Sequence, residues 1–198
     1  VSEQIERAKR RVEKKNPSGK YIAYFQSYTN TYAPAERLKA LFGEAIAHPD
    51  IAALSVGTRP DCLPPEVLEL LARLNKIKPV WVELGLQTIH EQTAEKIRRG
   101  YDLSVFDKAV KNCKAAGLYT VVHMIIGLPG ETPEMAAQTA GYIGKSGADG
   151  IKLQLLHVLR GTDMAEQYAA GEFEVMSMEE YISALEECVR RLPPQMTV

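Results

Sequence analysis

Chemically capable side chains lie inside short apolar runs of this sequence. Residues 80–87 and 119–127 form two such runs, which carry Glu83, Gln87 and His123 among aliphatic neighbours. In a strand, residues of equal parity share a face, so Glu83 and Gln87 should point the same way. Leaving a buried polar group without a partner costs about 1–3 kcal/mol. Several such groups at the ends of successive strands therefore predict a ligand site.

Similar polar groups follow every strand that the sequence predicts. They are amides, hydroxyls, guanidinium groups and imidazoles, which together suit a polar ligand bearing carboxylate, amine and ribose groups. In parallel α/β folds, ligands collect at the carboxyl ends of the strands, so we expect these groups to converge. The candidate cofactor-binding residues are Gln26, Ser27, Tyr28, Thr58, Arg59, Glu83, Gln87, Arg99, His123 and His157. The sequence singles out no catalytic acid or base and no set of metal ligands.

Several of these residues also have a structural interpretation. His123 can be a hydrogen-bonded core histidine, and Glu83 can pair with an interior Lys152. The Gly-Leu-Pro-Gly segment at 127–130 can be simple turn geometry, since glycine supplies positive φ. Arg99 can cap the end of its helix. The sequence lacks the G-x-x-x-x-G-K-[ST], G-x-G-x-x-G and H-E-x-x-H motifs, so these common nucleotide and zinc sites are not indicated.

Composition predicts one globular domain over residues 1–198. The chain is 45% hydrophobic and 25% charged with a net charge of −1, and it has no apolar run long enough for a membrane span. Cys62, Cys113 and Cys188 are odd in number and far apart, which argues against disulfides and favours a reducing, cytoplasmic location. The chain starts at Val1 and ends shortly after a Pro-Pro pair, so we interpret it as an excerpt of a longer protein.

The N-terminal segment is locally basic. Residues 2–15 have a helical pattern with Ser2 as N-cap. Its basic side chains are Arg7, Lys9, Arg10, Arg11, Lys14 and Lys15. A solvated helix face is the ordinary interpretation, and a contact surface for RNA is the alternative.

Strands and helices alternate along the whole sequence. Apolar strands are expected at 21–26, 51–57, 80–86, 121–126 and 150–156. Helices are expected at 34–47, 67–74, 91–98, 104–116, 133–145, 163–170 and 178–191. This alternation predicts an α/β fold with a parallel sheet. Polar groups after every strand favour a TIM-type barrel over a doubly wound sheet, which binds at a single switch point.

The order of elements is α(βα)5, as though a first strand were missing. Five parallel strands cannot close, so the edge of strand 21–26 should be exposed or covered by a neighbouring molecule. Self-association through this edge is therefore expected.

Four motifs resemble those of a known family. They are Thr-Arg-Pro-Asp at 58–61, Glu-Leu-Gly-Leu-Gln-Thr at 83–88, Arg-Arg-Gly-Tyr-Asp at 98–102 and Ile-Ile-Gly-Leu-Pro-Gly-Glu-Thr at 125–132. Their order and spacing resemble the radical S-adenosylmethionine (SAM) enzymes, and most closely the YhcC-like group. They are similar, more distantly, to the catalytic subunit of elongator and to oxygen-independent coproporphyrinogen III oxidase.

The resemblance implies a partial (βα)6 barrel that binds SAM and a [4Fe–4S] cluster. Its first strand and the loop carrying a C-x3-C-x2-C motif have no counterpart here, and three thiolates are needed to hold such a cluster. The resemblance therefore implies a truncated core, lacking cluster and activity as it stands. The intact enzyme would form a 5′-deoxyadenosyl radical that acts on an unknown substrate.

The resemblance also implies roles for individual residues. The loop at Gln26, Ser27 and Tyr28 occupies the slot of a glycine-rich segment that binds the SAM amino group. Gln87 and Arg99 match residues that reach the ribose and carboxylate of SAM. The remaining matches place Thr58, Arg59 and His123 near the ribose, and His157 near the adenine.

Two other functions compete with this interpretation. A non-radical barrel enzyme could bind a phosphorylated ligand, with Gly161-Thr162 as a weak phosphate loop. An RNA-binding module could use the basic N-terminal helix.

Overall fold

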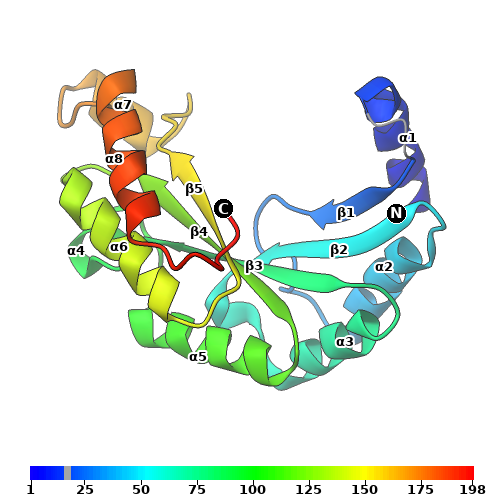
Figure 1. Cartoon of the computed structure of the whole chain (residues 1–198). Coiled ribbons are helices and arrows are strands. Elements are labelled where there is room, and N and C mark those ends of the chain that lie inside the picture. Colours follow the sequence, from blue (N-terminus) through cyan, green and yellow to red (C-terminus); the bar gives the residue numbers. More distant parts are fainter. Residues whose placement is uncertain (16–18) are drawn as a thin grey trace. The chain divides into compact units, whose positions relative to one another are not determined.

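Strands alternate with helices from end to end of the chain, as Figure 1 shows. The computed structural model describes residues 1–15 and 19–198. The five strands are β1 (Tyr21–Phe25), β2 (Ile51–Thr58), β3 (Val80–Gln87), β4 (Tyr119–Ile126) and β5 (Gly150–Leu155). They form one sheet in the order β1-β2-β3-β4-β5. The five strands expected from the sequence are thus confirmed in number and order.

Helices occupy the segments between the strands. The first part of the chain contains α1 (Ser2–Val12), η1 (Glu13–Lys15), α2 (Ala35–Ala47), η2 (Pro60–Cys62) and α3 (Pro65–Asn75). The later helices are α4 (Glu91–Lys96), α5 (Leu103–Ala115), α6 (Pro133–Lys145), α7 (Asp163–Ala169) and α8 (Met178–Arg190). No helix in the described residues is long and apolar enough to cross a bilayer.

The contacts within the chain divide it into two compact units. The first unit comprises residues 1–85 and 108–121, and the second comprises residues 86–107 and 122–198. Each unit is described by itself below. The prediction of a single domain remains a prediction.

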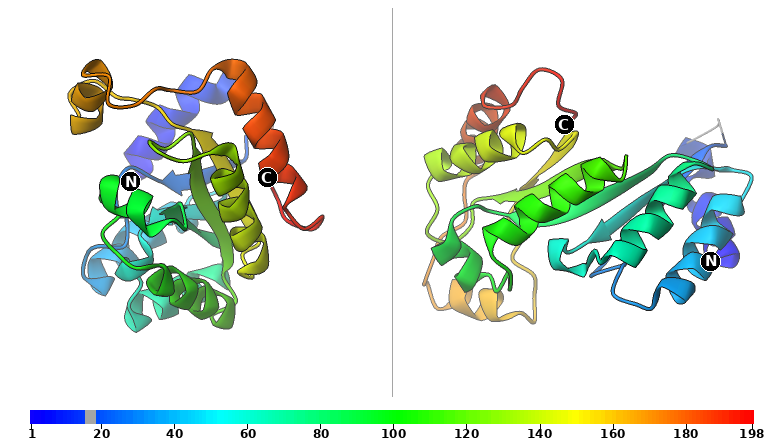
Figure 2. Two further views of the ribbon diagram at one scale, coloured as in Figure 1. Left: turned by 90° about the vertical axis from the view of Figure 1, so that its left-hand side faces the viewer. Right: turned by 90° about the horizontal axis from the view of Figure 1, so that it is seen from below.

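In the first unit, β1, β2 and β3 are parallel neighbours. Tyr24 lies opposite Ser55, and Gly57 lies opposite Glu83. Helices α2 and α3 pack side by side, as the right-hand view of Figure 2 shows. Phe42 of α2 is almost fully buried and meets Phe25 of β1 edge to face, with ring centroids 4.8 Å apart. Apolar burial of this kind fixes the register of the strands.

The outer edge of β1 has no second strand beside it in the described residues. Ile22 on this strand is half exposed. Residues of α1 and β1 together line an apolar groove. Self-association through the β1 edge remains a prediction.

In the second unit, α6 and α8 lie side by side in both Figure 1 and Figure 2. Thr132 caps α6 by accepting a hydrogen bond from the Met135 backbone N–H, and Pro133 occupies the first turn. Ser177 and Glu180 form a reciprocal capping box at the start of α8. These caps fix where both helices begin.

Two helical glycines offer a matched test of packing. A Cβ atom on Gly144 of α6 would lie 2.8 Å from the Cδ atom of Pro193, whereas one on Gly43 of α2 would meet nothing within 4 Å. We expect Gly144→Ala to lower the free energy of unfolding by about 1–3 kcal/mol through overpacking. Gly43→Ala should instead raise it by about 0.5–1 kcal/mol, because alanine favours helix. Chemical denaturation measures both, and equal effects would contradict the packing described here.

Candidate active site

Glu83 is the central polar group of the first unit. Its side chain lies on β3 and is buried. One carboxylate oxygen accepts a 2.7 Å hydrogen bond from the Tyr24 hydroxyl, and the other accepts one from the hydroxyl of Ser55. Burial, followed by this bond to Glu83, raises the pKa of Tyr24, so the phenol stays a donor. Sequence reasoning found Glu83 but missed Tyr24 and Ser55, which are polar groups on neighbouring strands.

The loop after β1 adopts an unusual backbone. Ser27 and Tyr28 both have positive φ, at 66° and 62°, which is the region that glycine favours. The Asn30 side-chain amide donates to the carbonyl oxygens of Ser27, Tyr28 and Gly57, at 3.3, 3.4 and 2.9 Å. The resemblance places a glycine-rich segment of the family at this loop. Here the hydrogen bonds of Asn30 hold Ser27 and Tyr28 in the backbone conformation that glycine favours. Gln26 lies at its start and also contributes to the α1–β1 groove.

Thr58, the last residue of β2, and Arg59, which follows it, both contact neighbouring side chains. The hydroxyls of buried Thr58 and Thr31 are 2.6 Å apart. Arg59 donates to both carboxylate oxygens of Asp61, at 2.9 and 2.8 Å. This pair holds the pKa of Asp61 below its usual range.

Gln87 combines two features of a ligand-binding residue in the second unit. It is the last residue of β3 and has a φ of 69°, although it is not glycine. Its Oε1 atom is buried and has no hydrogen-bond partner in the described residues. Strained backbone and unpaired buried polar atoms cost free energy, and both cluster at functional sites.

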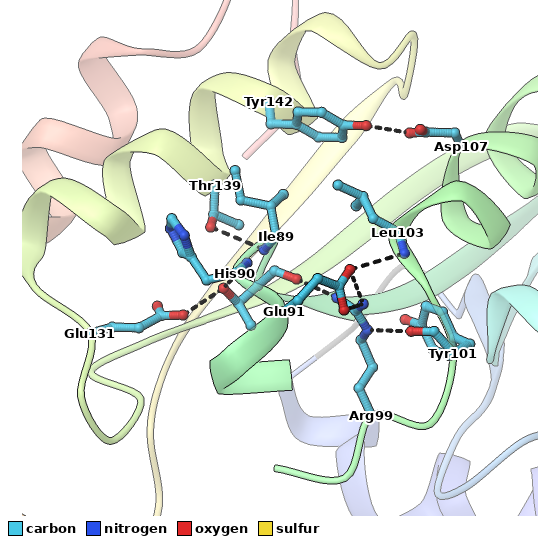
Figure 3. Close-up of polar contacts among 11 residues, drawn as sticks. Ile89, His90, Glu91, Arg99, Tyr101, Leu103, Asp107, Glu131, Thr139 and Tyr142 are labelled. Atoms are coloured by element: carbon cyan, nitrogen blue, oxygen red, sulfur yellow. Dashed lines mark hydrogen bonds and ion pairs between the residues drawn. The ribbon is translucent and has the colours of Figure 1, made fainter. Parts of the chain in front are cut away.

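Arg99 holds the turn that follows Gln87, as Figure 3 shows. Arg99 is buried, with 5% of the residue exposed. It donates to the carbonyl oxygens of Thr88 and Tyr101, at 2.7 and 2.9 Å, and to both carboxylate oxygens of Glu91, at 3.0 Å each. The guanidinium also lies 4.9 Å from the centroid of the Tyr101 ring. Because these contacts use all three nitrogens, Arg99 positions the turn that carries Gln87.

Further hydrogen bonds join the same turn to α6 and the loop before it. Thr88 donates to Glu131 at 2.5 Å, and the buried Thr139 hydroxyl accepts from the Ile89 backbone N–H at 3.3 Å. The dashed lines in Figure 3 mark these contacts. The second carboxylate oxygen of Glu131 is buried without a partner in the described residues. Sequence reasoning quoted Thr88 and Glu131 within motifs but did not select them as site residues.

The remaining candidates lie on or after β4 and β5. His123 is half-buried on β4, and Gly127 follows this strand with a φ of 86°. His157, exposed after β5, lines a cavity of about 260 Å³ with Gly127 and Met176. A Cβ atom on Gly127 would lie 3.3 Å from the Met176 sulfur, a tight contact, and the positive φ of this residue favours glycine.

The cysteines do not fit an iron–sulfur cluster. Cys62, Cys113 and Cys188 lie on η2, α5 and α8, and the last two are fully buried. Burial raises the pKa of Cys113 and of Cys188 to about 11 each, so both are thiols at neutral pH. Cluster ligands are thiolates. The three cysteines of this chain therefore supply no cluster site.

Thiol reactivity tests this assignment. Burial raises the pKa of Cys62 as well, but Cys62 is partly exposed, so at about pH 8 we expect a disulfide reagent to modify Cys62 alone in the folded protein. All three cysteines should react in concentrated guanidinium chloride. Rapid modification of Cys113 or Cys188 in the folded protein would contradict the burial described here.

Comparison with known proteins defines the class. The sequence profile of the Radical SAM superfamily matches residues 1–143, and that of the Radical_SAM C-terminal domain matches residues 148–198. The chain belongs to the radical SAM superfamily. Its fold is the partial (βα) barrel of that family, as predicted.

Relatives refine this placement. The chain is 42% identical to the uncharacterized protein YtqA of Bacillus subtilis over 96% of its length, and 38% identical to the protein YhcC of Escherichia coli over 91%. It spans 59% of the length of each of these relatives. It is also 31% identical, over 67% of its length and 25% of the relative, to a tRNA uridine(34) acetyltransferase of Methanocaldococcus jannaschii. The predicted resemblance to the YhcC-like group is confirmed.

Solved structures show the same fold. The archaeal Elp3 of Methanocaldococcus infernus superposes with a TM-score of 0.80 at 22% identity, covering 95% of this chain and 49% of that one. Coproporphyrinogen III oxidase (HemN) of Escherichia coli superposes with a TM-score of 0.65 at 19% identity, covering 85% and 39%.

Replacing Gln87 by glycine tests whether the turn stores strain. We expect Gln87→Gly to raise the free energy of unfolding by about 1–3 kcal/mol, because glycine accepts positive φ and the unpaired amide oxygen is removed. Thermal and chemical denaturation measure the gain. Gln92→Gly, at an exposed position of α4, should instead lower stability by about 1 kcal/mol. A loss of stability in both variants would show that Gln87 is not strained.

Proposed function

We propose that this chain is the SAM-binding core of a radical SAM enzyme. The observation that carries the proposal is Gln87, whose strained backbone and unpaired Oε1 sit at the carboxyl end of β3. Membership of the superfamily supports SAM as the ligand. When bound in such enzymes, SAM supplies a 5′-deoxyadenosyl group as the source of a radical.

Some residues of the proposed site would contact SAM, and others would hold those residues in position. Gln87 offers an amide oxygen that accepts a hydrogen bond from a ribose hydroxyl or the ammonium group of SAM. Arg99, Glu91 and Thr88 hold the turn in place, so Arg99 acts as a positioning residue with its charge near the SAM carboxylate. The positive φ of Ser27 supports a role for the loop after β1, whose backbone would receive the amino group.

The other predicted residues keep proposed contacts with SAM. Thr58 and Arg59, and His123 on β4, are proposed for the ribose, and His157, beside Gly127, for the adenine. Glu83 shapes the polar surface through Tyr24 and Ser55. No step is assigned to an iron–sulfur cluster, because the cysteines of this chain do not fit one.

Calorimetric titration tests the proposal. We expect the protein to bind SAM at a single site, and Gln87→Ala to weaken binding at least tenfold, since about 1.4 kcal/mol corresponds to a factor of ten. Gln92→Ala removes the same amide from an exposed position of α4 and should leave the affinity within twofold. Equal affinity in wild type and Gln87→Ala would refute the assignment, as would a failure of the wild type to bind SAM.

RNA is the substrate class that we propose for the intact enzyme. The supporting observation is the similarity to a protein named as a tRNA uridine(34) acetyltransferase, which exceeds 30% identity over two thirds of this chain.

A further inference from the structure

Helix α1 and the 3-10 helix η1 that follows it carry four basic side chains. Arg7, Arg10 and Arg11 recur at the i, i+3, i+4 spacing that places side chains on one face of α1, and Lys14 lies on η1. All four are exposed. None of them has an ion pair within the part of the chain that the structure describes. We call these four residues the α1 stripe.

The opposite face of α1 is anchored to the first unit. Lys9 lies 2.8 Å from Glu6 and 2.5 Å from Asp50, which follows α2. His48 Nε2 lies 2.9 Å from the same Glu6 oxygen. The hydrogen bonds from Lys9 lower the pKa values of Glu6 and Asp50, so both carboxylates stay charged at neutral pH. These contacts fix the rotation of the helix about its axis.

A metal ion does not explain this cluster. The ligand atoms of Glu6, His48 and Asp50 lie within 4.8 Å of one another. The Lys9 ammonium already bonds to both carboxylates and is the cation that they hold. The cluster therefore pairs Glu6 and Asp50 with Lys9, and neither carboxylate forms an ion pair with the α1 stripe in the described residues. Residues 2–15 contain six basic and three acidic side chains in a chain whose net charge is −1.

We infer that the α1 stripe is a docking surface for the phosphate backbone of RNA. The inference rests on RNA being the substrate class in the proposed function. Three of the four residues are arginines, whose planar guanidinium groups bind phosphate through two hydrogen bonds. At about 1.5 Å of rise per residue, the four charges extend over about 10 Å along the helix, which suits contact with successive phosphates.

An anionic membrane fits this helix less well. A helix that lies on a membrane must insert its apolar face. In α1 that face carries Ile5, Ala8 and Val12, which line the groove shared with β1. The apolar residues of α1 are three and face β1, whereas the exposed basic side chains face solvent, which favours a flexible polyanion over a lipid surface.

Fluorescence anisotropy with a labelled oligouridine tests the inference. The test variant replaces Arg7, Arg10, Arg11 and Lys14 by glutamine. We expect its affinity to fall at least tenfold, and the slope of log affinity against log salt to flatten by up to about 3, because four phosphate contacts are lost. The matched control replaces Lys39, Lys108, Lys111 and Lys114, which are also exposed, and should stay within twofold of wild type.

Three results would overturn the inference. They are no binding of oligouridine by the wild type, equal losses in the test and control variants, and equal binding of the wild type to phosphatidylserine vesicles. An Arg7→Lys, Arg10→Lys, Arg11→Lys variant keeps the charge and should retain affinity within about threefold of wild type, which separates lost contacts from lost folding.

SAM titration of the same variants separates this inference from the proposed function. The α1 variants should bind SAM like the wild type, whereas Gln87→Ala should bind oligouridine like the wild type. Failure of every protein to bind SAM, with RNA binding still dependent on the α1 stripe, would refute SAM binding alone.

Discussion

The buried guanidinium of Arg99 is the constraint on which the turn after β3 depends. The charge of a buried residue must find partners, because an unpaired buried charge costs several kcal/mol. Arg99 finds them in the backbone of Thr88 and Tyr101 and in the carboxylate of Glu91. Loss of one of these contacts would leave part of the buried guanidinium without a partner. These contacts therefore hold Gln87 at a positive φ, which the isolated chain would not favour.

The same requirement for partners applies to a buried polar group in the first unit. Glu83 is buried, and its charge is shared with two hydroxyl donors on neighbouring strands, Tyr24 and Ser55. The partners of Glu83 come from strands distant in sequence, whereas those of Arg99 lie within 11 residues of it. Binding surfaces of this kind are preorganised, since their side chains lose little freedom when a ligand arrives.

The alternation of apolar runs and amphipathic segments was enough to predict the five strands and their helices, because the strands are apolar runs such as residues 51–56, of which residues 53–56 are buried. The sequence also identified Gln87 and Glu83 as unusual polar residues. It could not predict the positive φ of Gln87, Ser27 or Tyr28, because tertiary contacts impose these angles against local preference. The sequence also could not predict the three groups that accept hydrogen bonds from Arg99, because the folded structure brings them together.

The two proposed binding surfaces differ in their charge. At the end of β3, Arg99 and Glu91 pair with each other, and the neutral amide oxygen of Gln87 and one oxygen of Glu131 have no hydrogen-bond partner in the described residues. On α1, Lys9 and His48 pair with Glu6, while Arg7, Arg10 and Arg11 are exposed to solvent. The first arrangement selects a small ligand by geometry, since a single acceptor discriminates by direction. The second attracts a polyanion over longer range with little selectivity for sequence, since contacts to phosphate position a nucleic acid without reading its bases. A protein that modifies a nucleic acid needs both kinds of surface, and they must be built from different residues because one requires burial and the other forbids it.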